Sequence, residues 1–341
     1  MTTQINNYCH IKVYHGYGHK DNLLIYGHVL AGKQKIQTHF SNNIIRNIFQ
    51  LIGLFFIKPI AKVSVTLNWR DQQFETVTSA DGFFKFEWKS DTAIDPGWHA
   101  VIVNLLGNVG KVISSSEGKI FVPHATQYGF ISDIDDTVLV SHSSKTGKKL
   151  YALFTKNPRG RKTFADVVKF YQLLSLAHTN AQLLNPFFYV SSSEWNLYDN
   201  LNEFFKFNDL PKGAFLLNEI KRWYQLFKTG QTKHQGKLIR VARIMEAFPK
   251  QRFVLLGDNS QRDPEIYVSI ANKYPDKIVA IYLRNIVKNK ELPTLELLRL
   301  VQNKTIGTCL FKHTDEAILH AQSIDLIADN YIYKSNQSTG K

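Results

Sequence analysis

Short apolar runs alternate with stretches of helical spacing in the second part of the chain, and this alternation constrains the fold more than any other feature. The apolar runs cover residues 128–132, 187–190, 253–256 and 278–283. Helical spacing covers residues 164–176, 195–205, 237–248 and 266–274. Such alternation predicts a parallel sheet flanked by helices. We therefore expect a Rossmann-like α/β domain over residues 126–334, followed by a flexible tail over residues 335–341.

The first part of the chain has a different pattern, with short strand-like runs separated by turn residues. These runs cover residues 24–30, 62–69, 74–78, 83–88, 99–105 and 119–122. The dipeptide Asp81-Gly82 is a strong hairpin signal and predicts pairing of the two strands beside it. Repeated short strands of this kind predict a β-sandwich domain over residues 1–125.

Residues 44–60 form an apolar insertion between the first and second of these predicted strands. The insertion contains Arg46, Asn47, Gln50 and Lys58, and it is shorter than the roughly 20 predominantly apolar residues that a spanning helix needs. Two structures remain open for it. The run is a buried helix, or it is an interfacial helix that contacts a membrane.

Polar residues follow three of the apolar runs in the second domain. The run 128–132 is followed by Asp133 and Asp135, and 187–190 by three serines. The third run is followed by Gly257 and Asp258. The carboxyl ends of parallel strands meet at one edge of an open sheet, where ligands bind. We therefore expect these side chains to form one site.

The residue types at this edge fit phosphoryl transfer. Asp133 can attack phosphorus as a nucleophile, and Asp135 can protonate the leaving oxygen and later activate water. Mg²⁺ prefers oxygen ligands, and the candidate metal-binding residues are Asp133, Asp135 through its carbonyl, Asp258 and Asp263. Hydroxyl and ammonium groups can hold phosphate oxygens. The candidate phosphate-binding residues are Thr137, Ser191, Ser192 and Lys237, and whether Ser191 or Ser192 faces the phosphate stays open.

The order of these motifs resembles the haloacid dehalogenase superfamily, in which DxDxT, a strand-end serine or threonine, a lysine and GDxxxxD follow one another. Further segments resemble the actin-patch phosphatidate phosphatase family over about residues 128–321: FFYVSSS at 187–193, WNLYD at 195–199, LPKG at 210–213, FVLLGD at 253–258, QRDPEIY at 261–267 and IYLR at 281–284. The preceding strand-rich region is similar to the amino-terminal region of bacterial members. The resemblance implies Mg²⁺-dependent hydrolysis of phosphatidic acid to diacylglycerol, with Asp133 as nucleophile and Asp135 as general acid and base.

Three positions depart from the family pattern. Glu194 replaces the proline that usually follows the serine motif, Gly236 replaces the histidine before the lysine, and Asn259 replaces the serine after Gly-Asp. None of these departures removes an expected catalytic group, and the first and third bear on substrate choice more than on catalysis.

The chain is strongly basic, with a formal net charge of +14 and a pI of about 9.5. Excess positive charge favours an anionic partner, and we expect an anionic phospholipid at a membrane surface rather than nucleic acid. A basic stretch over residues 145–162 is either a solvated loop or a surface that attracts anionic lipid. Cys9 and Cys309 are far apart and form no CxxC pair, which argues against a disulfide framework or a zinc site.

The first residues contain no apolar core typical of a secretory signal. We therefore expect a cytoplasmic, peripherally membrane-associated protein without a transmembrane span, and export without an amino-terminal signal stays open. Three functions remain in view: a phosphatidate phosphatase, a phosphatase for a soluble phosphate ester or phosphoprotein, and a membrane-binding scaffold with an inactive phosphatase half. The complete motif set argues against the scaffold.

Overall fold

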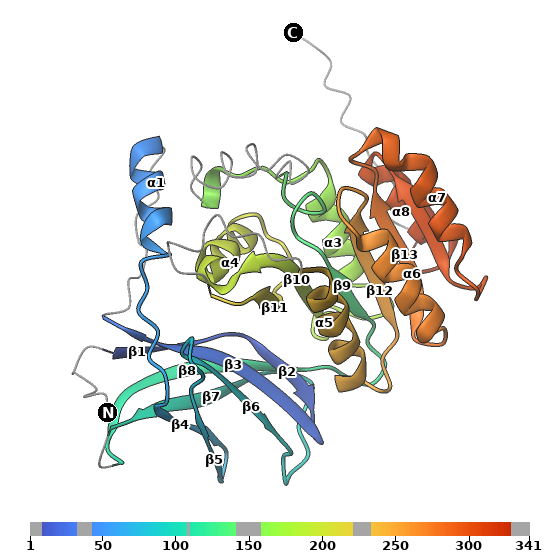
Figure 1. Ribbon diagram of the computed structural model, residues 1–341. Helices are drawn as coiled ribbons and strands as arrows, with labels where there is room; N and C mark the ends of the chain where they lie inside the picture. The colour runs from blue at the N-terminus through green and yellow to red at the C-terminus, as the bar shows by residue number, and fades with distance from the viewer. Residues whose placement is uncertain (1–8, 33–42, 108–109, 141–157, 221–232, 329–341) are drawn as a thin grey trace.

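The fold contains two sheets, each with its own set of strands (Figure 1). This computed structural model describes residues 9–32, 43–107, 110–140, 158–220 and 233–328. Most of the basic stretch over residues 145–162 and the carboxyl-terminal tail lie outside the described residues. Mixed α/β character, with a strand-rich amino-terminal part and a parallel sheet after it, is confirmed.

The amino-terminal sheet links eight strands in the order β1-β3-β2-β8-β7-β4-β5, with β6 paired to β3. The strands are β1 (Cys9–Val13), β2 (Gly16–His19), β3 (Asn22–Ala31), β4 (Ser64–Trp69), β5 (Gln72–Val77), β6 (Phe83–Trp88), β7 (Gly97–Leu106) and β8 (Val112–Val122). Every predicted strand is present. The sequence did not indicate β1 and β2, because β2 reads GYGH and glycine has little strand preference. The narrower assignment of a β-sandwich stays a prediction.

The hairpin predicted around Asp81-Gly82 is wrong. A turn does form there, because Gly82 has a φ of 75° and donates its N–H to the Ser79 carbonyl. The strands on its two sides have other partners, however: β5 pairs with β4, and β6 pairs with β3. A dipeptide can specify the turn, but the partner of each strand depends on which apolar surface it covers.

The parallel sheet has six described strands in the order β11-β10-β9-β12-β13-β14. They are β9 (Gly129–Ser132), β10 (Phe187–Glu194), β11 (Gly213–Asn218), β12 (Phe253–Asp258), β13 (Ile278–Arg284) and β14 (Gly307–Phe311). The chain runs outward from β9 through β10 to β11, and then crosses to β12, β13 and β14 on the other side. Such a reversal of strand order creates a crevice at the carboxyl ends of the central strands.

Helices flank this sheet (Figure 1). They are α3 (Val167–Ser175), α4 (Tyr198–Phe207), α5 (Lys233–Ala247), α6 (Asp263–Lys273), α7 (Glu291–Arg299) and α8 (Thr314–Ser323). The four predicted helices correspond to α3 through α6, whereas β11, β14, α7 and α8 were not predicted. Among the described residues, no helix has the length and apolar character needed to cross a membrane. The specific assignment to the haloacid dehalogenase fold stays a prediction.

The apolar insertion forms the helix α1 (Ile44–Gly53), which begins after the side-chain cap from Asn43. It lies between β3 and β4, which are the first and second of the strands predicted from the sequence. Of the alternatives left open for this segment, a buried helix does not hold for one of its faces. Leu51 is buried, but Ile45 and Phe49 are 65% and 70% exposed.

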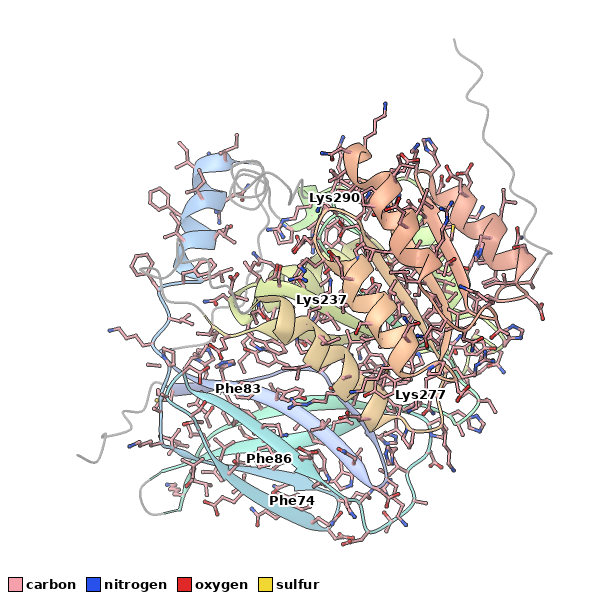
Figure 2. The ribbon with its side chains drawn as sticks, turned by 45° about the vertical axis from the view of Figure 1, so that its right-hand side comes forward. Phe74, Phe83, Phe86, Lys237, Lys277 and Lys290 are labelled. Carbon is pink, nitrogen blue, oxygen red and sulfur yellow. The ribbon has the colours of Figure 1, made fainter. Side chains whose placement is uncertain are left out.

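The two sheets pack against each other through aromatic side chains. Tyr14, just after β1, stacks on Trp195 with 4.0 Å between ring centroids, and Tyr17 on β2 meets Phe188 edge to face. These residues belong to the hydrophobic core of the parallel-sheet half. A second core lies within the amino-terminal sheet (Figure 2), where Phe86 is buried. The boundary predicted near residue 125 remains untested.

Candidate active site

The predicted motifs meet at the carboxyl edge of the parallel sheet. The central strand β9 is flanked by β10 and β12, so the residues after these three strands are neighbours. The Asp133 N–H donates to the Leu256 carbonyl at 2.8 Å, which fixes the end of β9 beside β12. The parallel register therefore brings together side chains that are more than a hundred residues apart in the sequence.

Three buried carboxylates form the centre of this site. One oxygen from each of Asp133, Asp258 and Asp263 lies within 4.8 Å of the others, and each residue is at most 2% exposed. Lys237, at the start of α5 (Figure 2), lies between two of them: its Nζ is 2.9 Å from Asp133 Oδ1 and also contacts Asp263 Oδ1. One ammonium group thus faces three carboxylates.

Burial of this cluster shifts the pKa values of its members. Burial raises the pKa of Asp133, Lys237 counteracts that rise, and Asp263 and Asp258 add to it. Burial, reinforced by Asp263, raises the pKa of Asp258 to about 7. Burial alone would lower the pKa of Lys237, but Asp133 and Asp263 raise it further than burial lowers it. Lys237 is therefore a permanent cation, and the carboxylates carry negative charge that it does not balance.

The donor set fits a divalent cation such as Mg²⁺. Among the described residues, Asp133 Oδ2 is buried without a hydrogen-bond partner, which is costly unless another group binds it. The surrounding ligand atoms are carboxylate oxygens, the type that Mg²⁺ prefers. Asp263 stands at the first position of α6, and its Oδ2 accepts the Asp258 N–H at 3.4 Å. This contact orients the two carboxylates relative to each other.

Asp135 interacts with groups that the sequence did not single out. Ser193 Oγ donates to Asp135 Oδ2 at 3.3 Å. The charge of Arg161, a side chain only 6% exposed, interacts with Asp135. Burial lowers the pKa of Arg161 to about 10, and Asp135 opposes that change. Strand alternation from Ser191 could have found Ser193, whereas nothing distinguished Arg161 from the other basic residues around it.

The remaining residues of the first motif, Asp136 and Thr137, form hydrogen bonds that stabilise the loop after β9. Asp136 has a φ of 60° and donates its N–H to the Leu139 carbonyl at 2.8 Å. Thr137 Oγ1 donates to Asp258 Oδ2 at 3.4 Å, and the Thr137 carbonyl accepts from Arg284 Nε at 3.3 Å. Thr137 therefore lies at the acidic cluster, and its proposed contact with phosphate stays a prediction.

The three serines after Val190 have different surroundings. Ser191 is fully buried, and its Oγ accepts the Ser193 N–H at 2.9 Å. The Ser192 carbonyl accepts from Asn218 Nδ2 at 2.9 Å. Arg240 on α5 donates to the Ser191 carbonyl at 3.3 Å. Ser193 is thus the serine whose hydroxyl reaches a predicted catalytic carboxylate, and the phosphate contacts predicted for Ser191 and Ser192 remain untested.

Asn259, one of the three departures from the family pattern, links two loops of the site. Its Nδ2 donates to Asn285 Oδ1 at 2.7 Å and to the Val287 carbonyl at 3.2 Å. Its Oδ1 accepts the N–H groups of Ile286 and Val287 at 2.7 and 2.9 Å. These contacts tie the end of β12 to the segment after β13.

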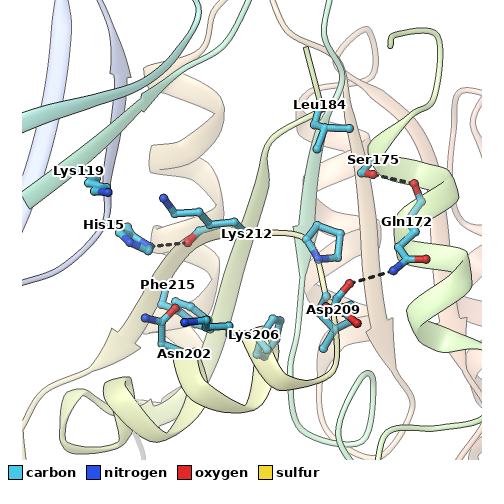
Figure 3. Close-up of a pocket in the computed structure, with 14 residues that line it drawn as sticks. His15, Lys119, Gln172, Ser175, Leu184, Asn202, Lys206, Asp209, Lys212 and Phe215 are labelled. Atoms are coloured by element: carbon cyan, nitrogen blue, oxygen red, sulfur yellow. Dashed lines mark hydrogen bonds between the residues drawn. The ribbon is translucent and has the colours of Figure 1, made fainter. Parts of the chain in front are cut away.

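A cavity of about 550 Å³ lies elsewhere, where the two sheets meet (Figure 3). Its lining contains none of the acidic cluster and includes Lys119, Lys206 and Lys212. His15, which also faces the cavity, is hydrogen-bonded through Nδ1 to the Gly213 carbonyl at 3.1 Å. The acidic cluster and this cavity are separate features.

Comparison with known proteins agrees with a phosphatase-type site. Residues 128–285 match the family described as the catalytic domain of phosphatidate phosphatase APP1. This family is a class of phosphatase catalytic domains. Over these residues the chain is similar to the actin-patch-type phosphatidate phosphatase family, which agrees with the resemblance found in the motifs. The match includes Asp133, Lys237 and Asp263.

Two yeast proteins have sequences similar to this chain. The chain is 30% identical over 158 residues to phosphatidate phosphatase APP1 of Saccharomyces cerevisiae, covering 46% of this chain and 25% of that protein. It is 24% identical over 207 residues to an uncharacterized protein of Schizosaccharomyces pombe, covering 58% of this chain and 33% of that protein. The chain therefore spans about a quarter to a third of the length of these curated relatives.

Likeness to solved structures is weak. A carbohydrate acetylesterase from Xanthomonas citri aligns over 91% of this chain and 72% of its own, with 7% identity and a TM-score of 0.32. A bacterial immunoglobulin-like domain from the M. primoryensis ice-binding adhesin aligns over 34% of this chain and 94% of its own, with 12% identity and a TM-score of 0.17. At these scores the alignments carry no argument about fold or function.

Proposed function

We propose that this protein is a Mg²⁺-dependent phosphatase that hydrolyses phosphatidic acid to diacylglycerol and phosphate. The observation that carries the proposal is the buried Asp133, whose Oδ2 has no hydrogen-bond partner among the described residues and whose Oδ1 is held by Lys237. The match of residues 128–285 to a phosphatidate phosphatase catalytic family supports the substrate.

Asp133 acts as the nucleophile in the first step. Its free carboxylate oxygen forms a bond to phosphorus, and the bond between phosphorus and the diacylglycerol oxygen breaks. Asp135 donates a proton to that leaving oxygen. The products of this step are diacylglycerol and an aspartyl phosphate on Asp133.

Asp135 acts as the base in the second step. It removes a proton from water as the water oxygen attacks phosphorus, which releases phosphate and restores the Asp133 carboxylate. Arg161 stabilises the negative charge of Asp135, and Ser193 orients it through a hydrogen bond. Both contacts suit a carboxyl group that must give up its proton and take another in each cycle.

Positive charge must offset the approach of a phosphate dianion to buried carboxylates. Lys237 supplies one permanent charge beside Asp133. Asp133, Asp258, Asp263 and the Asp135 carbonyl would hold Mg²⁺, which when bound supplies further charge neutralisation for the phosphate. Thr137, Ser191 and Ser192 would bind phosphate oxygens. The basic net charge of the chain supports peripheral attachment to a membrane that contains anionic lipid.

Phosphate release from a panel of esters tests this proposal. Wild-type protein should release phosphate from phosphatidic acid with Mg²⁺ and lose this activity in EDTA. Asp133→Asn should lower turnover by at least about a thousandfold, because the amide cannot form the covalent intermediate. Undiminished turnover by Asp133→Asn would overturn the mechanism. Preferential turnover of a nucleotide, sugar phosphate or phosphoprotein would overturn the substrate and favour a phosphatase for soluble esters.

A further inference from the structure

One face of α1 carries large apolar side chains that project into solvent. We define the α1 apolar face as Ile45, Phe49 and Ile52, which recur on the helix at a spacing of four and three residues, together with Phe56, which lies three residues beyond the end of the helix. Ile45 is 65% exposed, Phe49 70% and Phe56 61%. A contiguous stripe of this size is unlike the single exposed apolar residues that most surfaces carry.

The body of the protein contacts other residues of this segment. Leu51 and Phe55 are buried and belong to the hydrophobic core of the parallel-sheet half. Pro59 forms a bridge to Leu30 on β3, and the Lys58 carbonyl accepts the Ala31 N–H at 2.8 Å. The base of α1 is therefore fixed, while the helix projects away from the amino-terminal sheet, on the side of the parallel-sheet half where α4 lies (Figure 1).

The base of α1 is attached next to the candidate active site. Asn196 Nδ2 donates to the Leu54 carbonyl at 2.9 Å. Asn196 lies in the short helix η2 (Trp195–Leu197), which directly follows β10. Three residues earlier, Ser193 contacts Asp135. One short segment thus connects the exposed helix with the catalytic carboxylates.

The basic residues in the sequence around α1 favour binding to an anionic surface. There is no acidic residue between Asp21 and Asp71, whereas Lys33, Lys35, Arg46, Lys58, Lys62 and Arg70 fall in this interval. Arg46 is on α1 itself, and Lys58 is exposed just beyond the apolar face. Apolar side chains on one face of a helix, with basic residues beside them, are the features of a helix that lies in the interface of an anionic bilayer.

We propose that α1 is a membrane-docking helix whose apolar face enters the interfacial region of an anionic lipid bilayer and holds the active site at its surface. This inference rests on the proposed phosphatidate phosphatase function. A lipid substrate keeps its acyl chains in the bilayer, so an enzyme fixed at the surface meets the phosphate headgroup repeatedly. The contact through Asn196 keeps the docked helix and the β10 loop together.

Vesicle flotation of the full chain tests the proposal. The test variant is the triple substitution Ile45→Ser, Phe49→Ser and Phe56→Ser. The matched control is Leu292→Ser, Leu300→Ser and Leu319→Ser, whose side chains are 72%, 61% and 64% exposed at α7 and α8. Both variants should keep the wild-type melting temperature, because neither removes a buried side chain.

Binding should depend on both the helix and lipid charge. Wild-type protein and control should float with vesicles of phosphatidylcholine and phosphatidylglycerol, and less with phosphatidylcholine alone. The α1 variant should bind the anionic vesicles at least about tenfold more weakly, because fully burying a phenylalanine in an apolar phase is alone worth about that factor. Salt should weaken wild-type binding, since it screens the basic residues.

Activity measurements separate this inference from the proposed function. The α1 variant should hydrolyse a water-soluble phosphate monoester as fast as wild type and phosphatidic acid in vesicles at least about tenfold more slowly. Equal vesicle binding by wild type and α1 variant would overturn the docking role even if both hydrolyse phosphatidic acid. A dimer that the α1 variant abolishes, without vesicle binding by wild type, would also overturn it and assign the face to a second copy. Vesicle binding through α1 without phosphatidate hydrolysis would overturn the proposed function alone.

Discussion

Several carboxylates and one ammonium group are buried together at the carboxyl edge of the parallel sheet. Lys237 balances one charge of the trio Asp133, Asp258 and Asp263, and burial, reinforced by the charge of Asp263, raises the pKa of Asp258 to about 7. Buried charge is expensive unless it is paired. The cluster is therefore complete only with further positive charge, which agrees with a site for a divalent cation and phosphate.

Gly257 makes close packing of this cluster possible. A Cβ at this position would lie 2.5 Å from Asp263 Oδ2 and 2.7 Å from the Tyr267 ring. Gly257→Ala should therefore displace Asp263, destabilise the fold by roughly 1–3 kcal/mol and lower activity at least about tenfold. Chemical denaturation and phosphate release measure these effects. The control Gly53→Ala, where a Cβ meets nothing within 4 Å, should leave both unchanged. Wild-type behaviour of Gly257→Ala would contradict this account of the packing.

At the scale of elements, the position of each motif follows from the strand that precedes it. Strands β9, β10 and β12 are adjacent and parallel, so their carboxyl ends deliver the motifs to one place. The segments after β12 and β13 need a further link, because adjacent strand ends alone do not fix loop conformation. Asn259 provides this link with donors and an acceptor directed at Asn285, Ile286 and Val287.

Asn259→Ser tests the link between these two loops. Serine is the residue usual at this position in the family that the motifs resemble, but its single hydroxyl is too short to replace all four hydrogen bonds of a fully buried amide. We expect a loss of about 1–3 kcal/mol in unfolding free energy, measured by urea denaturation. Asn68→Ser, at an exposed position of β4, is the control and should change stability little. Equal stability of Asn259→Ser and wild type would show that the four bonds add nothing net.

At the scale of the whole molecule, the two sheets are packed against each other through side-chain contacts. Tyr14 contacts Trp195 and Tyr198, and Lys12 forms an ion pair with Asp199 at 2.8 Å. His15 lies in the same interface, where its backbone N–H donates to Tyr198 Oη at 3.2 Å. The amino-terminal sheet thus supports α4 and the end of β10, which lead into the candidate site.

The interface should weaken in acid because His15 is held neutral. Burial lowers the pKa of His15 to about 4, and Lys212 and Lys119 lower it further while the bond to Gly213 opposes the change. The unfolded chain has the ordinary pKa of about 6.5, so it binds a proton first as the pH falls. His15 should therefore cost about 2 kcal/mol of stability between pH 7 and pH 5. Urea denaturation over this range should show a shallower loss for His15→Gln, and an identical slope would contradict the buried neutral histidine.

The sequence by itself predicted which residues gather at the candidate site and where most of the local elements lie. Asp133, Asp258 and Lys237 were identified because strand ends and helix starts are local patterns, and parallel strands must present their carboxyl ends at one edge. Tertiary structure decided what local patterns cannot contain. It gave β5 and β6 separate partners despite the turn between them, brought Arg161 and Ser193 to Asp135, and left large side chains of the α1 apolar face exposed. Each of these outcomes depends on which distant surface a residue meets, and no spacing within one segment encodes that choice.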